Sequence, residues 1–239
     1  MPIGVIINGL SVAVGGFLGA KFGKIISQDL KEKLNLVFGL CSMTIGISSI
    51  ILIENLPPVI LSLILGTIAG SLLRIGTRIE RAGAGLSNLF SGHERSETGN
   101  NNALMVTAIV LFCASGTGIF GTIVSGMSGD HSILIAKSVL DLFTAMIFAC
   151  SLGLSVSAIA IPQTIFFLLL FFSAKLIYPL TTPSMINDFK ACGGIILLAT
   201  GFRITKIRDF PIADMIPSMI LVWFTSYAWT AWIVPMLIR

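Results

Sequence analysis

Long apolar runs, separated by short charged or proline-containing segments, follow one another along this 239-residue chain. A helix needs about 17 to 25 predominantly apolar residues to cross the hydrocarbon core of a bilayer. The runs that approach or reach this length cover residues 3–20, 36–53, 58–73, 103–125, 133–154, 158–177, 189–204 and 212–236. The pattern predicts an all-α fold, a polytopic membrane helix bundle of about eight transmembrane helices. Because the third and seventh runs are short and the fourth is rich in glycine, seven spans or a re-entrant segment is the alternative.

The composition agrees with a chain that lies mostly in membrane lipid. Hydrophobic residues make up 55% of the sequence and charged residues 11%, with a mean hydropathy of +0.97, whereas soluble proteins carry about 25% charged residues. So few ionised side chains do not cover a water-facing surface, which excludes a soluble enzyme. We expect a single transmembrane domain over residues 1–239. Its one extended polar segment, at about 76–102, is predicted to be a flexible cytoplasmic linker.

Basic residues gather on one side of the predicted topology. With eight spans, the loops on that side hold eleven of the 15 Lys and Arg, and the other side holds at most four. The positive-inside rule places the richer side in the cytoplasm and both termini outside it. This topology accounts for the net charge of +4 without a nucleic-acid partner. Arg74, Arg78 and Arg81 share one helical face, which is expected either to lie along the anionic inner leaflet or to form a solvated helix extension.

The residue types that carry most enzyme and cofactor chemistry are scattered. The four cysteines lie inside apolar runs and form no CxxC pair, and the two histidines lie in separate loops. This spacing indicates neither a disulfide framework nor a metal site. The sequence contains no Ser–His–Asp arrangement, HExxH or Walker motif. It therefore predicts a protein that is not an enzyme and that uses no cofactor.

Two distant parts of the chain share a spacing of glycine and acidic residues. Gly46 and Glu54 are as far apart as Gly201 and Asp209, and both stretches lead into a run that begins near a proline. The second and seventh runs cross in opposite directions under the loop-charge topology. This predicts an inverted duplication of spans one to three and six to eight, an architecture found in secondary transporters. Chance similarity is the alternative in a chain with 24 glycines.

The fourth run contains Gly116, Gly118 and Gly121 in the spacing GxGxxG. In a strand–turn–helix unit this spacing binds a dinucleotide pyrophosphate, but here no soluble strand precedes it and no acidic residue is placed to meet a ribose. Beside Ser115 and Thr117, the glycines instead indicate one of two alternatives. One is close helix packing, and the other is a broken helix that exposes backbone amides and carbonyls to a cavity.

Lys137 and Asp141 are four residues apart in the fifth run, so they share one face of a helix. At a rise of about 1.5 Å per residue from Asp130 at the outer boundary, Asp141 lies about 16 Å into the membrane. A lone carboxylate at that depth costs about 2.5 to 3.5 kcal/mol, so it is expected to face protein or water and to be paired. Two interpretations remain open. The pair is either a coupling-ion, proton or substrate site, with Asp130 recruiting a cation, or a structural ion pair.

The first run carries an isolated polar residue and a stripe of small ones. Asn8 lies among apolar residues, where it either hydrogen-bonds a neighbouring helix or lines a polar pathway. Gly15, Gly19 and Gly23 repeat as GxxxGxxxG, and Gly66 and Gly70 of the third run have the same GxxxG spacing, which brings helices into close contact. We expect spans one and three to dock through these faces or to form a homodimer contact. Small-residue stripes serve packing within one chain equally well.

Several stretches together resemble a known family. They are the opening GVIINGLSVAVGGFLGA, the central LFCASGTGIFGTIVSGMSGDHSILIAKSVLDLFTAMIFACSLG and the late LTTPSM and LLATGFRI. On these stretches the sequence resembles the bacterial YqgA-like family along essentially its whole length. The family motif falls on Asn8, Gly16, Gly19, Cys113, Gly118, Gly121, Gly126, Gly129, Asp130, Lys137, Ser138 and Asp141. The resemblance implies a multi-pass protein of the bacterial cell inner membrane. Because family members are known as uncharacterised or putative transport proteins, it implies location and architecture more than activity.

Together these features predict a secondary transporter of a small polar solute or ion. Its substrate- or ion-binding residues are predicted to be Asn8, Ser115, Gly116, Thr117, Gly118, Gly121, Asp130, Lys137 and Asp141. A broken helix offers directional dipoles, and an intramembrane carboxylate offers a titratable charge. Two alternatives use the same residues: a passive ion channel, or a non-transporting scaffold or lipid-interaction protein in which they only pack helices.

Overall fold

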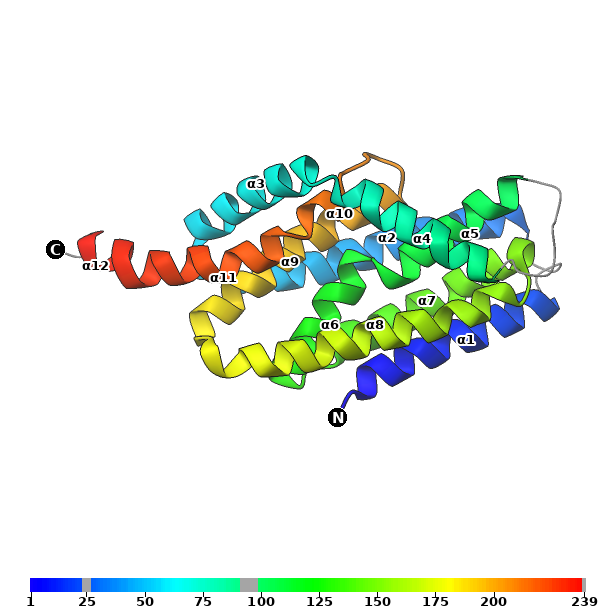
Figure 1. Cartoon of the computed structure of the whole chain (residues 1–239), viewed down its shortest axis with the longest axis horizontal. Coiled ribbons are helices and arrows are strands. Elements are labelled where there is room, and N and C mark those ends of the chain that lie inside the picture. Colours follow the sequence, from blue (N-terminus) through cyan, green and yellow to red (C-terminus); the bar gives the residue numbers. More distant parts are fainter. Residues whose placement is uncertain (23–26, 91–98, 238–239) are drawn as a thin grey trace. The chain divides into compact units, whose positions relative to one another are not determined.

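The computed structural model describes residues 1–22, 27–90 and 99–237, and all the regular elements in these ranges are helical. In chain order (Figure 1) they are α1 (Ile3–Phe22), α2 (Gln28–Ile50), α3 (Leu56–Leu72), α4 (Ile75–Phe90), α5 (Gly99–Cys113), α6 (Gly116–Ser128), α7 (Ser132–Leu152), α8 (Ser155–Ile177), the 3₁₀ turn η2 (Tyr178–Leu180), α9 (Pro183–Ile204), α10 (Ile212–Met215), α11 (Ser218–Ala228), the π-helical η3 (Trp229–Ile233) and α12 (Val234–Leu237). The predicted all-α fold is confirmed.

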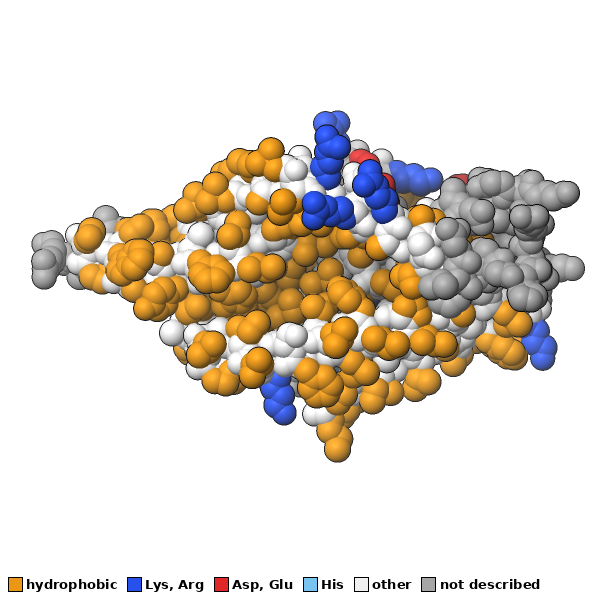
Figure 2. Space-filling view, viewed as in Figure 1, with side chains coloured by type: hydrophobic (Ala, Val, Ile, Leu, Met, Phe, Trp, Pro, Cys, Tyr) orange, Lys and Arg blue, Asp and Glu red, His pale blue; other side chains and the backbone are white. Residues whose placement is uncertain are grey.

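The helices have the length and surface of membrane spans. Among the described residues, seven helices are long and apolar enough to cross a bilayer, and α3 with α4 forms a bent pair that makes an eighth candidate. Hydrophobic side chains cover most of the face seen in Figure 2. Leu10, Leu169 and Phe224, for example, expose 60%, 63% and 68% of their surface. Apolar surface on this scale is typical of contact with a membrane, so the chain is a membrane protein with seven to eight candidate spans.

The chain divides into two compact units, and each takes two separate stretches of sequence. The first unit comprises Met1–Asn35 and Thr77–Leu176, and the second comprises Leu36–Gly76 and Ile177–Arg239. A single domain over 1–239 and a flexible linker at 76–102 both stay predictions. Of that linker, residues 76–90 lie in α4 and residues 99–102 in α5, while 91–98 lie outside the described residues.

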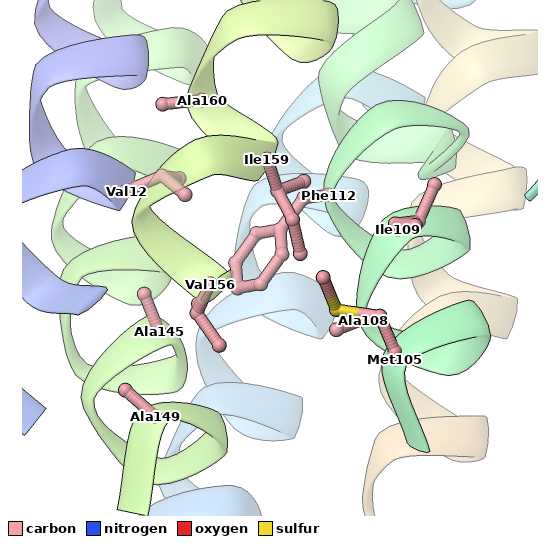
Figure 3. Packing of buried hydrophobic residues seen from close by; sticks show 10 residues of the cluster. All are labelled: Val12, Met105, Ala108, Ile109, Phe112, Ala145, Ala149, Val156, Ile159 and Ala160. Carbon is pink, nitrogen blue, oxygen red and sulfur yellow. The ribbon is translucent and has the colours of Figure 1, made fainter. Parts of the chain in front are cut away.

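An apolar core joins four helices of the first unit (Figure 3). Its buried members come from α1, α5, α7 and α8: Val12, Met105, Ala108, Ile109, Phe112, Ala145, Ala149, Val156, Ile159 and Ala160. The ring of Phe112 packs edge-on against Phe148 with centroids 6.2 Å apart. Small residues allow the close approach elsewhere, since a side chain at Gly15 or Gly19 of α1 would strike the backbone of α7. This packing places α1 beside α7 (Figure 1) and fixes the side chains between them.

In the second unit, glycines of α3 face the C-terminal helices. A side chain at Gly66 would strike Ser218, and one at Gly70 would strike the backbone of Asp214. The predicted docking of spans one and three through their glycine faces is therefore wrong, because α7 covers the face of α1 and α10 and α11 cover that of α3. A GxxxG spacing allows any backbone to come close and does not specify which one. The predicted homodimer stays a prediction.

The helices that the predicted repeat would relate are in contact. Helices α2 and α9, and α3 and α11, pack antiparallel in the second unit, and α1 packs antiparallel to α8 in the first. An inverted repeat requires these directions. Any two spans with an even number of other spans between them in the chain also run antiparallel. The contacts therefore agree with the repeat without establishing it. The inverted repeat stays a prediction.

Candidate functional site

Lys137 and Asp141 form a buried ion pair near the middle of α7, in the first unit. Nζ of Lys137 lies 2.5 Å from Oδ2 of Asp141, and the two side chains expose 4% and 9% of their surface. Helix α7 is continuous over this stretch, so residues four apart stack on one face. Placing two charges out of water costs several kcal/mol per ion before their attraction is counted. The carboxylate is thus paired within the protein, as its depth in the span requires.

Two amides from neighbouring helices surround the carboxylate. Asn8 of α1 donates from Nδ2 to Oδ2 of Asp141 at 2.8 Å. Gln163 of α8 donates from Nε2 to Oδ1 of Asn8 at 2.6 Å, and its Nε2 also lies 3.5 Å from Oδ2 of Asp141. Both amide side chains are fully buried. We call Asn8, Lys137, Asp141 and Gln163 the buried polar cluster. Its ammonium group and amide groups converge on a single carboxylate oxygen.

One acceptor in this cluster has no donor. Oε1 of Gln163 is buried and accepts no hydrogen bond from any residue that the structure describes. Nε2 of the same amide is held by Asn8, and covalent geometry fixes Oε1 at about 2.3 Å from that nitrogen. A buried polar atom without a partner costs about 1 to 3 kcal/mol. Oε1 of Gln163 is therefore the acceptor of this cluster that the described residues leave without a donor.

The fourth predicted span is a broken helix. Helix α5 ends at Cys113 and α6 begins at Gly116. Between them, Ser115 has extended backbone geometry and caps α6, since its Oγ accepts the backbone N–H of Gly118 at 3.1 Å. Gly116 and Thr117, both buried, form the first turn of α6. At the break, the C-terminus of α5, which carries the negative end of its dipole, meets the N-terminus of α6, which carries the positive end, inside the first unit.

Gly118 brings the start of α6 against the ion pair. A Cβ added at Gly118 would lie 2.9 Å from Cε of Lys137 and would overlap the ring of Phe167. Gly121, one turn further, faces the side chains of Ile133 and Leu134 instead. Glycine at position 118 is therefore what allows the Lys137 side chain to lie along α6. The glycines are closely packed and the helix is broken, while exposure of its backbone groups to a cavity stays a prediction.

Asp130 lies apart from these residues. It is exposed in the turn between α6 and α7, where its Oδ1 accepts the backbone N–H of Ser132 at 2.9 Å. In the same turn, Nδ1 of His131 lies 2.6 Å from Oγ of Ser125, a partner that the sequence did not indicate. The structure thus brings Asn8, Lys137 and Asp141 together and leaves Asp130 outside the buried polar cluster.

Sequence reasoning missed Gln163 altogether. The residue follows Pro162 inside α8, and its two cluster partners lie 22 and 155 positions away. A signal was present, because Gln163 and Thr164 are the only polar residues in 158–172. A polar side chain in mid-span needs a partner inside the protein. A search for polar residues within the apolar runs would therefore have identified Gln163.

An apolar groove of about 220 Å³ opens on the same unit. Its lining comes from α4, α5 and α8 and includes Ile79, Leu86, Val110, Cys113, Ala114 and Pro162. The groove reaches the break after α5 and the residue before Gln163.

The second unit contains a buried carboxylate of a different kind, Asp188 of α9. Its Oδ1 accepts the backbone N–H groups of Glu54 and Asn55 at 3.2 and 2.8 Å. Its Oδ2 accepts Nδ2 of Asn55 at 3.0 Å and Oγ of Ser226 at 2.6 Å. All four donors are neutral, and Asn55 is the residue that caps α3. Asp188 therefore anchors the N-terminus of α3, a structural role that sequence reasoning also missed.

Comparison with known proteins places these features in a family. The family model described as "Protein of unknown function (DUF554)" matches residues 3–227. The chain is 48% identical to "Uncharacterized protein YqgA" of Escherichia coli (strain K12), over 97% of this chain and 99% of that protein. It is 25% identical to "Uncharacterized membrane protein YdfK" of Bacillus subtilis (strain 168), over 91% and 93%. No solved structure matches the chain. The resemblance to YqgA noted in the sequence is thereby confirmed, and the chain belongs to the DUF554 family.

Proposed function

We propose that this protein is a secondary transporter of a small polar solute or ion, and that the buried polar cluster is its substrate or coupling-ion site. One observation carries the proposal: a buried Lys137–Asp141 ion pair lies in mid-span beside an amide oxygen, Oε1 of Gln163, that has no partner. Ionisable residues at this depth are costly and usually mark ion or substrate pathways. A purely structural pair would gain from complete hydrogen bonding, which this cluster lacks.

The broken helix supports the same proposal. In many transporters, discontinuous helices direct their dipole ends at substrates and coupling ions near the bilayer midplane. Here the break between α5 and α6 adjoins the Lys137 side chain through Gly118. Ser115 satisfies one of the first backbone amides of α6, and the first turn keeps the positive dipole end. A polar solute would therefore meet both a charged pair and oriented backbone groups.

A thermal-stability screen of detergent-purified protein against ions, amino acids and small organic acids tests the proposal. A ligand at 100 times its Kd adds about 2.7 kcal/mol to the free energy of unfolding. We expect Asp141→Asn to lose this stabilisation and uptake by proteoliposomes, and Asp130→Asn, which changes an exposed carboxylate outside the cluster, to keep both. Wild-type uptake by the Asp141→Asn protein would refute the assignment.

The location is part of the proposal. We infer a multi-pass protein of the bacterial inner membrane with both termini in the periplasm, because the basic residues concentrate in alternate loops. For example, the C-terminal ends of α3 and α9 are followed or occupied by Arg74, Arg203 and Lys206. Their N-terminal ends begin at the uncharged residues Asn55 and Thr182.

A further inference from the structure

We infer that the buried polar cluster is a cation site whose present occupant is the Lys137 ammonium, and that a soluble monovalent cation binds there when this ammonium moves away. The inference rests on the proposed function, because it names the kind of ion or group that the same site takes. It concerns binding alone, so it can be tested separately from transport.

The cluster contains the kinds of oxygen atom that a cation prefers. Asp141 supplies a carboxylate, and Asn8 and Gln163 each carry an amide oxygen. With Lys137 in place both amides turn their nitrogens toward Oδ2 of Asp141, so a soluble cation takes the amide oxygens when the two amides rotate. These three residues come from α7, α1 and α8, so they surround a point between helices. Hard cations bind carboxylate and carbonyl oxygens. Oε1 of Gln163 already lacks a donor, which leaves one ligand unused while Lys137 occupies the site.

Lys137 is held on one side and opposed on the other. Its Nζ bonds Oδ2 of Asp141 at 2.5 Å, while its Cε lies against Gly118 in the first turn of α6. The N-terminus of a helix carries a partial positive charge, which disfavours an ammonium beside it. A lysine is a compact charge on a flexible four-carbon stem, so it can leave Asp141 without a change in the backbone of α7.

Exchange conserves the charge that Asp141 faces. With the ammonium withdrawn, the carboxylate would be left buried and uncompensated, which is strongly unfavourable. A monovalent cation in the same place restores the balance and also engages Oε1 of Gln163. An alkali-metal ion and the ammonium head of an organic solute share this chemistry, and the experiment distinguishes them.

The experiment measures thermal unfolding of the full-length protein in detergent, with choline chloride replaced stepwise by sodium, potassium or methylammonium chloride at constant ionic strength. Lys137→Met removes the tethered occupant and leaves Asp141 in place. We expect this variant to respond to a cation at about tenfold lower concentration than the wild type, because no internal ammonium competes. Lys137→Arg keeps an occupant and should show no such gain.

Two further variants show where the cation binds. Lys137→Met combined with Asp141→Asn removes both charges and should respond to none of the salts. Lys137→Met combined with Gln163→Met removes the unpartnered oxygen and should weaken the response about tenfold. A stronger effect of sodium or potassium identifies an alkali-metal site, and a stronger effect of methylammonium identifies an organic ammonium site.

An equal salt response of Lys137→Met and of the double variant without charges would overturn the inference. So would a Lys137→Met or Lys137→Gln protein that cannot be folded even when it is expressed and purified in saturating sodium or methylammonium, since the cation should replace the lost charge. Cation binding without uptake of any solute would refute the proposed transporter and support the cation site. Solute uptake by the wild type in choline buffer, with no cation response in Lys137→Met, would support the transporter and refute the cation site.

Discussion

Gly46 of α2 and Gly194 of α9 meet so closely that a Cβ added to either would lie 2.7 Å from the carbonyl oxygen of the other. Gly39 and Gly201 repeat the relationship further along the same helices, at 3.0 and 2.7 Å. Between the two pairs, Oγ of Ser42 donates to the carbonyl oxygen of Leu197 at 3.0 Å. The two antiparallel helices thus contact each other backbone to backbone, with a local twofold relationship between the glycine pairs.

We expect Gly194→Leu to destabilise the protein by about 1 to 3 kcal/mol or more, because the new side chain must displace the backbone of α2. The matched control is Gly85→Ala, since a Cβ at Gly85 in α4 meets nothing within 4 Å. That substitution should stabilise slightly, by about 0.5 to 1 kcal/mol, as expected for alanine in an unobstructed helix. Unfolding in mixed detergent measures both, and equal stability of the two variants would contradict the packing.

Asp141→Asn should cost about 3 to 5 kcal/mol of unfolding free energy, because it leaves the buried Lys137 ammonium without its counter-charge. Adding Lys137→Met to it should restore most of this loss, since removal of both charges is often close to neutral. Equilibrium unfolding in choline buffer, without small cations, provides the comparison. A double variant less stable than Asp141→Asn alone would show that the charges do not interact as a pair.

Gly118→Ala should abolish ligand stabilisation, because its methyl group would contact Cε of Lys137 and the ring of Phe167 and so displace the ion pair. Gly121→Ala adds the same methyl group one turn away, against the side chain of Ile133. We expect both variants to lose stability, by about 1 to 3 kcal/mol, and only Gly118→Ala to lose binding. A thermal-shift titration with the ligand found for the wild type measures this, and identical titrations would argue against a site beside α6.

Asp188→Ala should destabilise the second unit by about 1 to 3 kcal/mol, since it leaves the part-buried backbone N–H of Asn55 without its acceptor. Asn187→Ala is the neighbouring control. Its Nδ2 bonds Glu54 at 2.6 Å in an exposed position, so its loss should change stability by less than about 0.5 kcal/mol. Neither change should alter ligand stabilisation in the first unit. A loss of binding in Asp188→Ala would show that this carboxylate has more than an anchoring role.

The proposed orientation predicts which loops a membrane-impermeant maleimide reaches in intact cells permeable at the outer membrane. In a background without Cys41, Cys113, Cys150 and Cys192, Thr181→Cys should be labelled and Lys206→Cys should not. Both positions lie at the ends of α9 or just beyond them, where the positive-inside rule assigns them to opposite sides. Lysis of the cells should expose Lys206→Cys to the reagent. The reverse pattern would place both termini in the cytoplasm.

The parts of the site that the sequence predicted are local. Lys137 and Asp141 share a helix face through their spacing alone, and the depth of Asp141 in an apolar run required a partner. The glycines beside Ser115 marked a place where a helix either breaks or packs closely. Intervals of a few residues were sufficient for each of these inferences, and the spans followed from apolar length in the same way.

The parts that it did not predict depend on contacts between distant segments. Asn8 reaches Asp141 over 133 positions, and Gln163 reaches Asn8 over 155, so neither bond leaves a periodic signal. The partners of Gly66 and Gly70 were assigned wrongly for the same reason, since close packing constrains the size of a residue and not the identity of its neighbour. The role of Asp188 was missed for a similar reason, since the backbone N–H groups that it accepts, from Glu54 and Asn55, lie 134 and 133 positions away.

Lys137 and Asp141 belong to one helix, so any displacement of α7 along the membrane normal moves a net charge of zero. A single elementary charge carried through the same field would exchange about 2.3 kcal/mol per 100 mV with it. The pair therefore makes the site indifferent to the membrane potential while the Lys137 ammonium occupies it. A soluble cation that enters while Lys137 keeps its proton adds one charge to what α7 carries, so voltage acts on the site only when it holds a soluble cation.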